Sequence, residues 1–255
     1  MKLYKTNALV LRSNRLKDAD KILTLYSPDF GKIRAVAYGV AKPKSRKREA
    51  VQPLCYSDFL LYRGKELDSI SQCEWKELFP GIRSDLNKIA YASYAVELVD
   101  RLTVEGEPNK SLFQLLLYTL YFFERGGDES FLRIFEAKLI KILGYMPLLH
   151  ECVNCGAKPG GKAFYFSQAM GGAICSECKT ADEKSIPLGI GLLKILSLLF
   201  SWDPMKLQKL KISKNYDRDL KKILYSYITY ILEGQARSVK FIKEVTPFSY
   251  DHRHE

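Results

Sequence analysis

The sequence predicts an α+β fold: a small N-terminal β-barrel followed by an all-α domain that carries a four-cysteine, zinc-ribbon-like insert. Turn-separated β-type segments fill the first 80 residues, and a helical period replaces them at Asp85. Two Cys-x-x-Cys pairs then interrupt the helical part. We therefore expect one domain over residues 1–80 and a second over residues 81–255, with the insert at about 150–180.

Five segments near the N-terminus have the composition of strands, because they are β-branched, aromatic or alternately apolar. They cover residues 7–12, 21–26, 32–38, 51–62 and 67–78. Gly31 and Gly64 lie in turn segments between them. No helical pattern is long enough for a parallel βαβ unit, which favours a small Greek-key barrel of the OB-fold type. A β-sandwich or an SH3-like barrel would give a similar string.

From Asp85 onwards, apolar residues recur every three to four positions, as in a helix that faces a core. We expect helices from Leu86 to Leu102, over 111–125, from Phe131 to Ile142, over 187–202 and over 216–233. Asp128 is the expected cap of the third of these, and Gly144 and Gly234 are the expected stops.

Bulk composition indicates a globular protein, with 47% apolar and 27% charged residues in 255. The N-terminus does not resemble a signal peptide, and no apolar run approaches the ~20 residues of a membrane span. A cytoplasmic location is therefore expected.

The net charge is +11, and residues 1–80 hold 16 basic and 9 acidic residues, which is most of the excess. This asymmetry points to a polyanionic partner for the first domain.

The paired cysteines predict a zinc site. Cys-x-x-Cys is the shortest loop that lets two thiolates bind one tetrahedral ion, and 19 residues separate the pairs. Gly156 supplies a residue tolerant of positive φ behind the first pair. Four thiolates fill all four positions, so we expect one structural Zn²⁺ and no catalytic metal, with Cys152, Cys155, Cys175 and Cys178 as ligands. His150 is read as a solvated or core residue, and Cys55 and Cys73 as small buried residues.

A basic loop, GVAKPKSRKREA, follows the third predicted strand. That strand alternates, so Lys32, Arg34, Val36 and Tyr38 should share an exposed face. Cations beside an aromatic residue on a small barrel are typical of a groove for single-stranded nucleic acid, although a solvated surface loop is the plain alternative. The expected DNA-binding residues are Arg12, Arg15, Lys17, Lys21, Lys32, Arg34, Tyr38, Lys42, Lys44, Arg46, Lys47 and Arg48.

No catalytic motif competes with this interpretation. The sequence has no phosphate-binding Gly-x-x-x-x-Gly-Lys-Ser/Thr loop, and Gly189-Ile190-Gly191 lacks the third glycine of a dinucleotide fingerprint. Asp18 and Asp20 could form a metal pair, but we interpret them as a solvated turn or as partners of Lys17 and Lys21. We therefore expect a protein that is not an enzyme.

Several local motifs stand in a specific order along almost the whole chain. They are Ala8 to Arg12, Asp18-Ala19-Asp20-Lys21 to Gly31-Lys32, Gly39 through Pro53, Leu143 to Leu148 leading into Cys152 to Gly156, Gly171 to Cys175 leading to Cys178, and Gly234 through Ile242. In this order the chain resembles RecO, a bacterial family of recombination-mediator and DNA repair proteins. Asp18 departs from the glutamate that many relatives carry.

The resemblance implies binding of single- and double-stranded DNA, annealing of complementary strands in the response to DNA damage, and association with the nucleoid. It also implies work with RecR and RecF, and assistance to RecA in displacing the single-stranded-DNA-binding protein, whose acidic tail would be contacted. The residues alone leave two alternatives open: a zinc-ribbon RNA-binding or ribosome-associated module, and a zinc-dependent hydrolase or nuclease.

Overall fold

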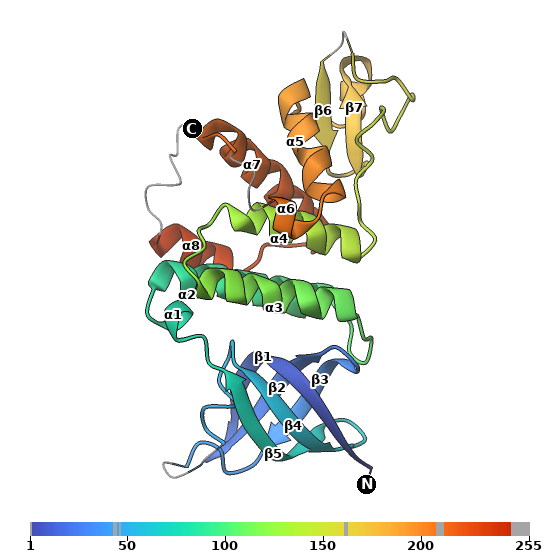
Figure 1. The fold of residues 1–255 in the computed structure, drawn as a ribbon. Coiled ribbons are helices and arrows are strands. Elements are labelled where there is room, and N and C mark those ends of the chain that lie inside the picture. The colour runs from blue at the N-terminus through green and yellow to red at the C-terminus, as the bar shows by residue number, and fades with distance from the viewer. Residues whose placement is uncertain (1, 43–44, 46, 161–162, 208–211, 246–255) are drawn as a thin grey trace. The chain divides into compact units, whose positions relative to one another are not determined.

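The structure is a computed structural model that describes residues 2–42, 45, 47–160, 163–207 and 212–245 (Figure 1). The chain forms two compact units. The first comprises Met1–Asp128 with Ala236–Glu255, and the second comprises Glu129–Gln235. The predicted fold class is confirmed, because a closed five-stranded barrel precedes helices and a four-cysteine segment lies among them.

The barrel closes in the order β1-β2-β3-β5-β4. Its core is built by alternation: Leu23 and Leu25 on β2 face inward, as do Ile33 and Ala35 on β3. The strands are β1 (Leu3–Lys17), β2 (Asp20–Ser27), β3 (Gly31–Ala37), β4 (Tyr56–Tyr62) and β5 (Asp68–Glu77).

The expected strand over 51–62 is wrong in its first part, because β4 begins only at Tyr56. Leu54 has a left-handed φ of 66°, and its N–H donates to the carbonyl of Val10 at 3.0 Å. The chain therefore turns tightly onto β1 before it enters β4, although the apolar side chains of Val51 and Leu54 are still buried.

The described part of the first unit also contains the helices α1 (Pro80–Arg83), α2 (Leu86–Leu102), α3 (Lys110–Glu124) and α8 (Ser238–Val245). Asp85 caps α2, since its carboxylate accepts hydrogen bonds from the backbone N–H groups of Asn87 and Lys88. The short helices α1 and α8 were not expected. Each is held by a distant carboxylate: Glu124 accepts from the N–H groups of Gly81 and Ile82 at the start of α1.

The connection between α2 and α3 runs beside β3. The Gly106 N–H donates to the Lys32 carbonyl at 3.0 Å, and Glu105 pairs with Lys32 as a parallel bridge. Gly31 permits this approach, because a Cβ added at its φ of 65° would lie 2.1 Å from the Glu107 carbonyl oxygen. Part of β3 is therefore covered by chain that the sequence placed in the helical domain.

The second unit combines helices with a small sheet of order β7-β6-β8. Its elements are α4 (Phe131–Ile142), β6 (Phe164–Ser167), β7 (Gly172–Cys175), the 3₁₀ helix η1 (Ser176–Ala181), β8 (Ile186–Pro187), α5 (Ile190–Ser201), α6 (Pro204–Leu207) and α7 (Lys214–Ile231). The N-cap position of α4 is Ser130, so the expected cap at Asp128 is wrong. Among the described helices, none combines the length and apolar character needed to cross a membrane.

Candidate nucleic-acid interface and metal centre

The four expected ligands meet in the second unit. The Sγ atoms of Cys152, Cys155, Cys175 and Cys178 all lie within 4.8 Å of one another, and those of Cys155 and Cys175 are 3.7 Å apart. A tetrahedral ion bound at ~2.3 Å by four sulfurs requires edges of about 3.8 Å. The cluster therefore has the size that one such ion needs.

Two local devices bring the thiols together. Gly156 has a φ of 72° and its N–H donates to the Cys152 carbonyl at 2.9 Å, which closes the first loop as the sequence indicated. The hairpin of β6 and β7 pairs Phe164 with Cys175, and η1 then turns Cys178 back toward the cluster. Tertiary folding thus joins pairs that lie far apart in sequence.

Backbone groups prepare Cys152 to ionise. Burial opposes the charged form, but N–H groups directed at its sulfur, from Cys175, Cys155 and Asn154, together lower the pKa of Cys152 to about 6. The Cys175 N–H lies 3.3 Å from that sulfur. A thiolate with such donors is a suitable metal ligand. The donor set therefore fits a thiophilic ion such as Zn²⁺, and His150, which is exposed beside Glu151, lies outside the cluster.

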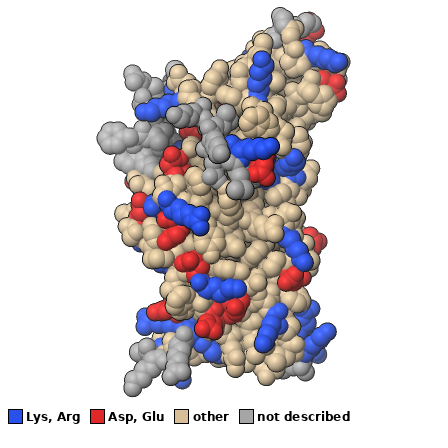
Figure 2. All heavy atoms as spheres, viewed as in Figure 1, with Lys and Arg blue, Asp and Glu red and all other residues tan. Residues whose placement is uncertain are grey.

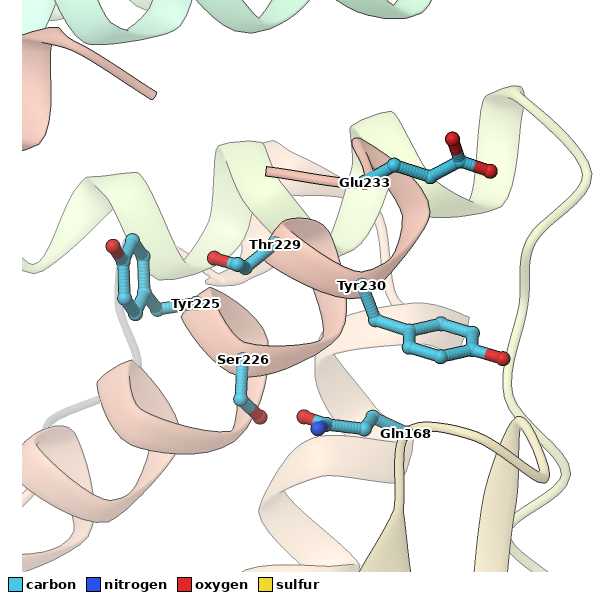
Figure 3. A pocket seen from close by; sticks show the side chains of 6 residues that line it. All are labelled: Gln168, Tyr225, Ser226, Thr229, Tyr230 and Glu233. Atoms are coloured by element: carbon cyan, nitrogen blue, oxygen red, sulfur yellow. The ribbon is translucent and has the colours of Figure 1, made fainter. Parts of the chain in front are cut away.

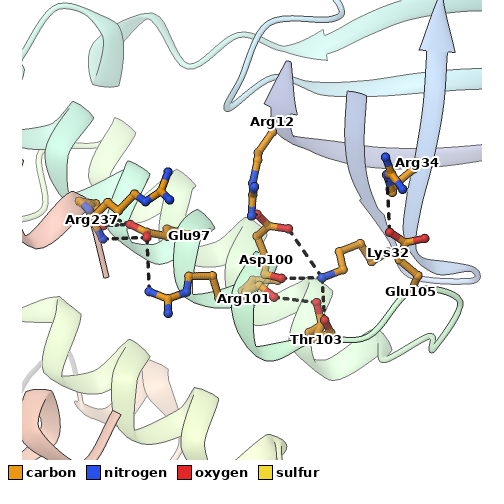
Figure 4. A network of polar contacts seen from close by, with 11 residues as sticks. Arg12, Lys32, Arg34, Glu97, Asp100, Arg101, Thr103, Glu105 and Arg237 are labelled. Atoms are coloured by element: carbon orange, nitrogen blue, oxygen red, sulfur yellow. Dashed lines mark hydrogen bonds and ion pairs between the residues drawn. The ribbon is translucent and has the colours of Figure 1, made fainter. Parts of the chain in front are cut away.

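In the barrel, the expected DNA-binding residues fall into separate groups. Arg12, Thr24 and Arg34 are register partners across β1, β2 and β3, so they share the outer face of the sheet. On this face, Arg12 forms an ion pair with Asp100 of α2 (Figure 4). The side chain of Asp100 is only 5% exposed. The Lys32 ammonium lies 3.7 Å from the same carboxylate.

Lys32 is also bound at the end of α2. Its Nζ donates to the carbonyls of Asp100 and Thr103 at 2.5 and 2.6 Å, and only 12% of its side chain is exposed. Arg34 lies 3.7 Å from Glu105, with both side chains about half exposed. The expectation that Val36 shares an exposed face is wrong, since Val36 is 6% exposed. Three of the expected cations thus have acidic partners within the unit.

A second group gathers where the β1–β2 turn meets the loop after β3. The Ala41 N–H donates to the Ala19 carbonyl at 2.9 Å, and the Gly39 N–H donates to the Asp20 carboxylate at 2.7 Å. Arg15 and Lys21 are direct cross-strand partners. We call this set the tip cluster, which comprises Arg15, Lys17, Lys21, Tyr38 and Lys42.

The tip cluster has the character of an anion site. Like charges placed opposite each other on a sheet destabilise it, so the pairing of Arg15 with Lys21 favours a counter-charge there, whereas Lys17 already faces Asp20 across the same turn. Tyr38 is 62% exposed, which leaves its ring free for stacking. On the face shown in Figure 2, basic and acidic side chains are interspersed. The net charge of the chain therefore does not by itself indicate where the tip cluster lies.

The remaining loop residues differ from one another. The Lys47 Nζ donates to the Ser71 carbonyl of β5, while Arg48 is exposed. Lys44 and Arg46 lie outside the described residues. No local pattern indicated Asp100 and Glu105 as partners, because each is one acidic residue at or beyond the end of an apolar helical stripe. Of the two single cysteines, Cys55 is fully buried as expected and Cys73 is half-buried.

Fold and site define an OB-fold-type protein with a four-cysteine module in its helical part. Comparisons with known proteins agree: the family model "Recombination protein O N terminal" matches residues 1–79, and "Recombination protein O C terminal" matches residues 83–240. The chain belongs to the RecO family of DNA repair proteins, as the resemblance in sequence suggested.

Curated relatives cover nearly the whole chain. The chain is 45% identical over 242 residues to the DNA repair protein RecO of Desulforamulus reducens, an alignment of 95% of this chain and 94% of the relative. It is 46% identical over 242 residues to that of Pelotomaculum thermopropionicum, with the same coverage. For Thermoanaerobacter sp. the identity is 34% over 251 residues, covering 96% of this chain and 99% of the relative.

Proposed function

We propose that this protein binds single- and double-stranded DNA reversibly, anneals complementary strands, and assists RecA loading together with RecR and RecF. The observation that carries the proposal is the tip cluster, where four cations and an exposed aromatic ring are assembled by two hydrogen bonds between separate loops. Membership of a family of DNA repair proteins agrees with it.

The tip cluster accounts for reversible binding. Cations that replace the counterions of phosphates gain affinity from counterion release, and Tyr38 adds stacking that any base can satisfy. Neither contact reads a sequence, so strands of any sequence can bind and exchange at the same site. Annealing needs this combination, because two polyanions must approach each other and the protein must then release the duplex.

Within the proposed site, the cations contribute unequally. Arg12, Lys32 and Arg34 have acidic partners at α2 and the connection after it, so phosphates must compete for them. The tip cluster, with Arg48 and the loop residues Lys44 and Arg46, supplies the main contacts. No covalent step is assigned to any of these groups, and the protein acts by binding alone.

The four-cysteine cluster is proposed to hold one structural Zn²⁺. Cys152, Cys155, Cys175 and Cys178 supply four sulfurs, which is the complete ligand set of a closed structural site. When bound, the ion would supply folding stability to the insert and no reactive position. Contacts to RecR, and to the acidic tail of the single-stranded-DNA-binding protein, complete the proposed role in the cell.

The proposal is tested by the salt dependence of binding to an oligodeoxythymidine, followed by fluorescence anisotropy. The variant Arg15→Ala/Lys17→Ala/Lys21→Ala/Lys42→Ala should bind more weakly, and the slope of log K against log salt should flatten by roughly 3, at about 0.7 per lost phosphate contact. The matched control removes four exposed lysines elsewhere in the same unit: Lys5, Lys65, Lys110 and Lys240.

An unchanged slope in the tip variant, or an equal change in the control, would refute the assignment of the tip cluster. A second arm uses RNA and DNA of one sequence as competitors. Strong preference for RNA would contradict the DNA repair function and favour an RNA-binding module. Failure of the wild-type protein to speed pairing of complementary oligonucleotides would exclude annealing.

A further inference from the structure

The outer face of α7 carries a row of cations in the second unit. Leu220, Ile223, Leu224, Tyr227 and Ile228 are buried on one side of this helix. Lys214, Arg218 and Lys222, spaced four residues apart, lie on the opposite side and are exposed. Successive members are about 6 Å apart along the helix axis.

This row is locally unfavourable. Like charges at i,i+4 destabilise a helix. Within the described chain, Lys214 and Lys222 take part in no ion pair, and Arg218 has only a 3.9 Å contact to the exposed neighbour Asp219. Such a row is neutralised best by an anion that extends along the helix.

Beyond the cations, the same face forms one wall of a cavity of about 510 Å³ (Figure 3). Tyr225, Ser226, Thr229, Tyr230 and Glu233 of α7 line it, and Gln168 from the β6–β7 turn faces Ser226 across it. The Thr229 hydroxyl oxygen is inaccessible to solvent and has no hydrogen-bond partner in the described structure. Tyr230 is 51% exposed, so a planar ligand group can stack on its ring.

Charge is divided between these two parts of the face. Of the described residues that line the cavity none is a cation, and Glu233 contributes a carboxylate. The fitting occupant is therefore anionic where it follows Lys214, Arg218 and Lys222, and neutral and planar where it enters the cavity. A single nucleic-acid strand has this division between phosphates and bases. An acidic peptide would place its own carboxylates next to Glu233.

We propose that the outer face of α7, with Gln168, is a second binding surface for single-stranded DNA. The inference rests on the proposed function, in which the tip cluster of the barrel holds the first strand. Two surfaces on one chain raise the local concentration of the second strand near the first. The encounter of the two strands, which limits annealing when the strands are dilute, therefore becomes faster.

The test uses the full chain and a short oligodeoxythymidine of ~6–8 nucleotides that carries 5-iododeoxyuridine. After ultraviolet crosslinking and peptide mapping, adducts are expected on Tyr225 or Tyr230 as well as on Tyr38. At saturation, the wild type should bind two oligonucleotides per chain. The variant Arg218→Ala/Lys222→Ala/Tyr225→Ala should bind one and should anneal at least about five-fold more slowly.

The matched control, Lys184→Ala/Lys194→Ala, removes two exposed cations from the same unit and should behave as the wild type. Circular dichroism checks that each variant is folded, and Arg218→Lys/Lys222→Arg should retain both strands. Adducts on Tyr38 alone, with one oligonucleotide per chain, would overturn this inference and leave the proposed function standing. Absence of any adduct would contradict both this inference and the proposed function. Binding at α7 of a fluorescent Asp-rich peptide, but not of the oligonucleotide, would also overturn it.

Discussion

Asp100 is the acidic partner of two cations of the barrel, Arg12 and Lys32. It is buried at the end of α2, where it meets Arg12 and the Lys32 ammonium (Figure 4). A buried carboxylate needs such partners, because an unpaired charge in that position would be strongly destabilising. Arg12 and Lys32 thus stabilise the contact between barrel and helix, in addition to any role toward DNA.

This geometry predicts unequal effects of two single substitutions. Lys21→Ala removes a cation that faces Arg15 across the sheet, and should weaken binding of single strands by roughly five-fold at ~0.1 M salt. Arg12→Ala removes a cation that Asp100 already partners, and should change binding less than two-fold, or about 0.4 kcal/mol. Anisotropy titrations at one salt concentration compare them; equal losses would show that Arg12 contacts DNA directly.

Asp100→Ala should instead act on stability. It leaves Lys32 with its two carbonyl acceptors but removes the charge that partners Arg12, and should cost about 1–3 kcal/mol of unfolding free energy. Denaturant unfolding measures the cost. The control Glu105→Ala removes an exposed partner of Arg34 and should cost under about 1 kcal/mol. A cost for Asp100→Ala as small as that of the control would contradict this account.

Glu97 acts at the start of an element, α8. Its carboxylate accepts from the N–H groups of Arg237 and Ser238 at 2.8 and 2.7 Å and from the Ser238 hydroxyl. Burial alone would raise the pKa of Glu97, but these hydrogen bonds and the charge of Arg101 hold the pKa below its usual value. The carboxylate replaces the cap that the helix would otherwise lack.

A pH dependence of α8 follows. Because the folded pKa of Glu97 is depressed, its stabilising effect is complete above the ordinary carboxyl pKa of ~4.3 and is lost as pH falls through the folded value. Amide exchange in α8, corrected for intrinsic rates, should therefore lose protection as the pH falls below that ordinary carboxyl pKa. Glu97→Gln should show weaker protection, by roughly five-fold, with little pH dependence. Glu244→Gln, on the exposed side of α8, is the control; pH dependence retained in Glu97→Gln would refute the assignment.

The four-cysteine module allows a prediction of both metal content and thermal stability. Cys175→Ser removes a buried ligand, and should release the metal and lower the melting temperature of the second unit by roughly 10 °C or more. Metal analysis and calorimetry give the two readings. Cys73→Ser, at a half-buried cysteine of the barrel, should keep the metal. Full metal content in Cys175→Ser would contradict the four-sulfur site.

At the scale of the whole molecule, the two compact units should respond separately to loss of the proposed Zn²⁺. A chelator should reduce the amide protection of residues 150–182, while β1 to β5 keep theirs. Binding to single strands by the tip cluster should keep its salt slope, because that cluster is held by hydrogen bonds within the first unit. Parallel loss of barrel protection and DNA binding on chelation would show that the metal supports the barrel as well.

Residue pattern predicted much of this molecule because the physical signals are local. Alternation on β3 indicated its inward face, the periodic stripe that starts after Asp85 indicated α2, and Gly156 indicated the first cysteine loop. Prediction failed where a distant group intervened. The short helix α8 depends on Glu97, 141 residues away from Ser238, and no local propensity reports such a partner.

The sequence by itself determined the β-type first domain, the main helices, the four thiols and the family, since side-chain periodicity and ligand spacing are properties of neighbouring residues. Only the tertiary structure decided which cations of the barrel have acidic partners and which gather in the tip cluster. Segments far apart in the chain pair Arg12 and Lys32 with Asp100, and join the loop at Gly39 and Ala41 to the turn at Ala19 and Asp20. Electrostatic interaction depends on distance in space, which the order of residues does not specify.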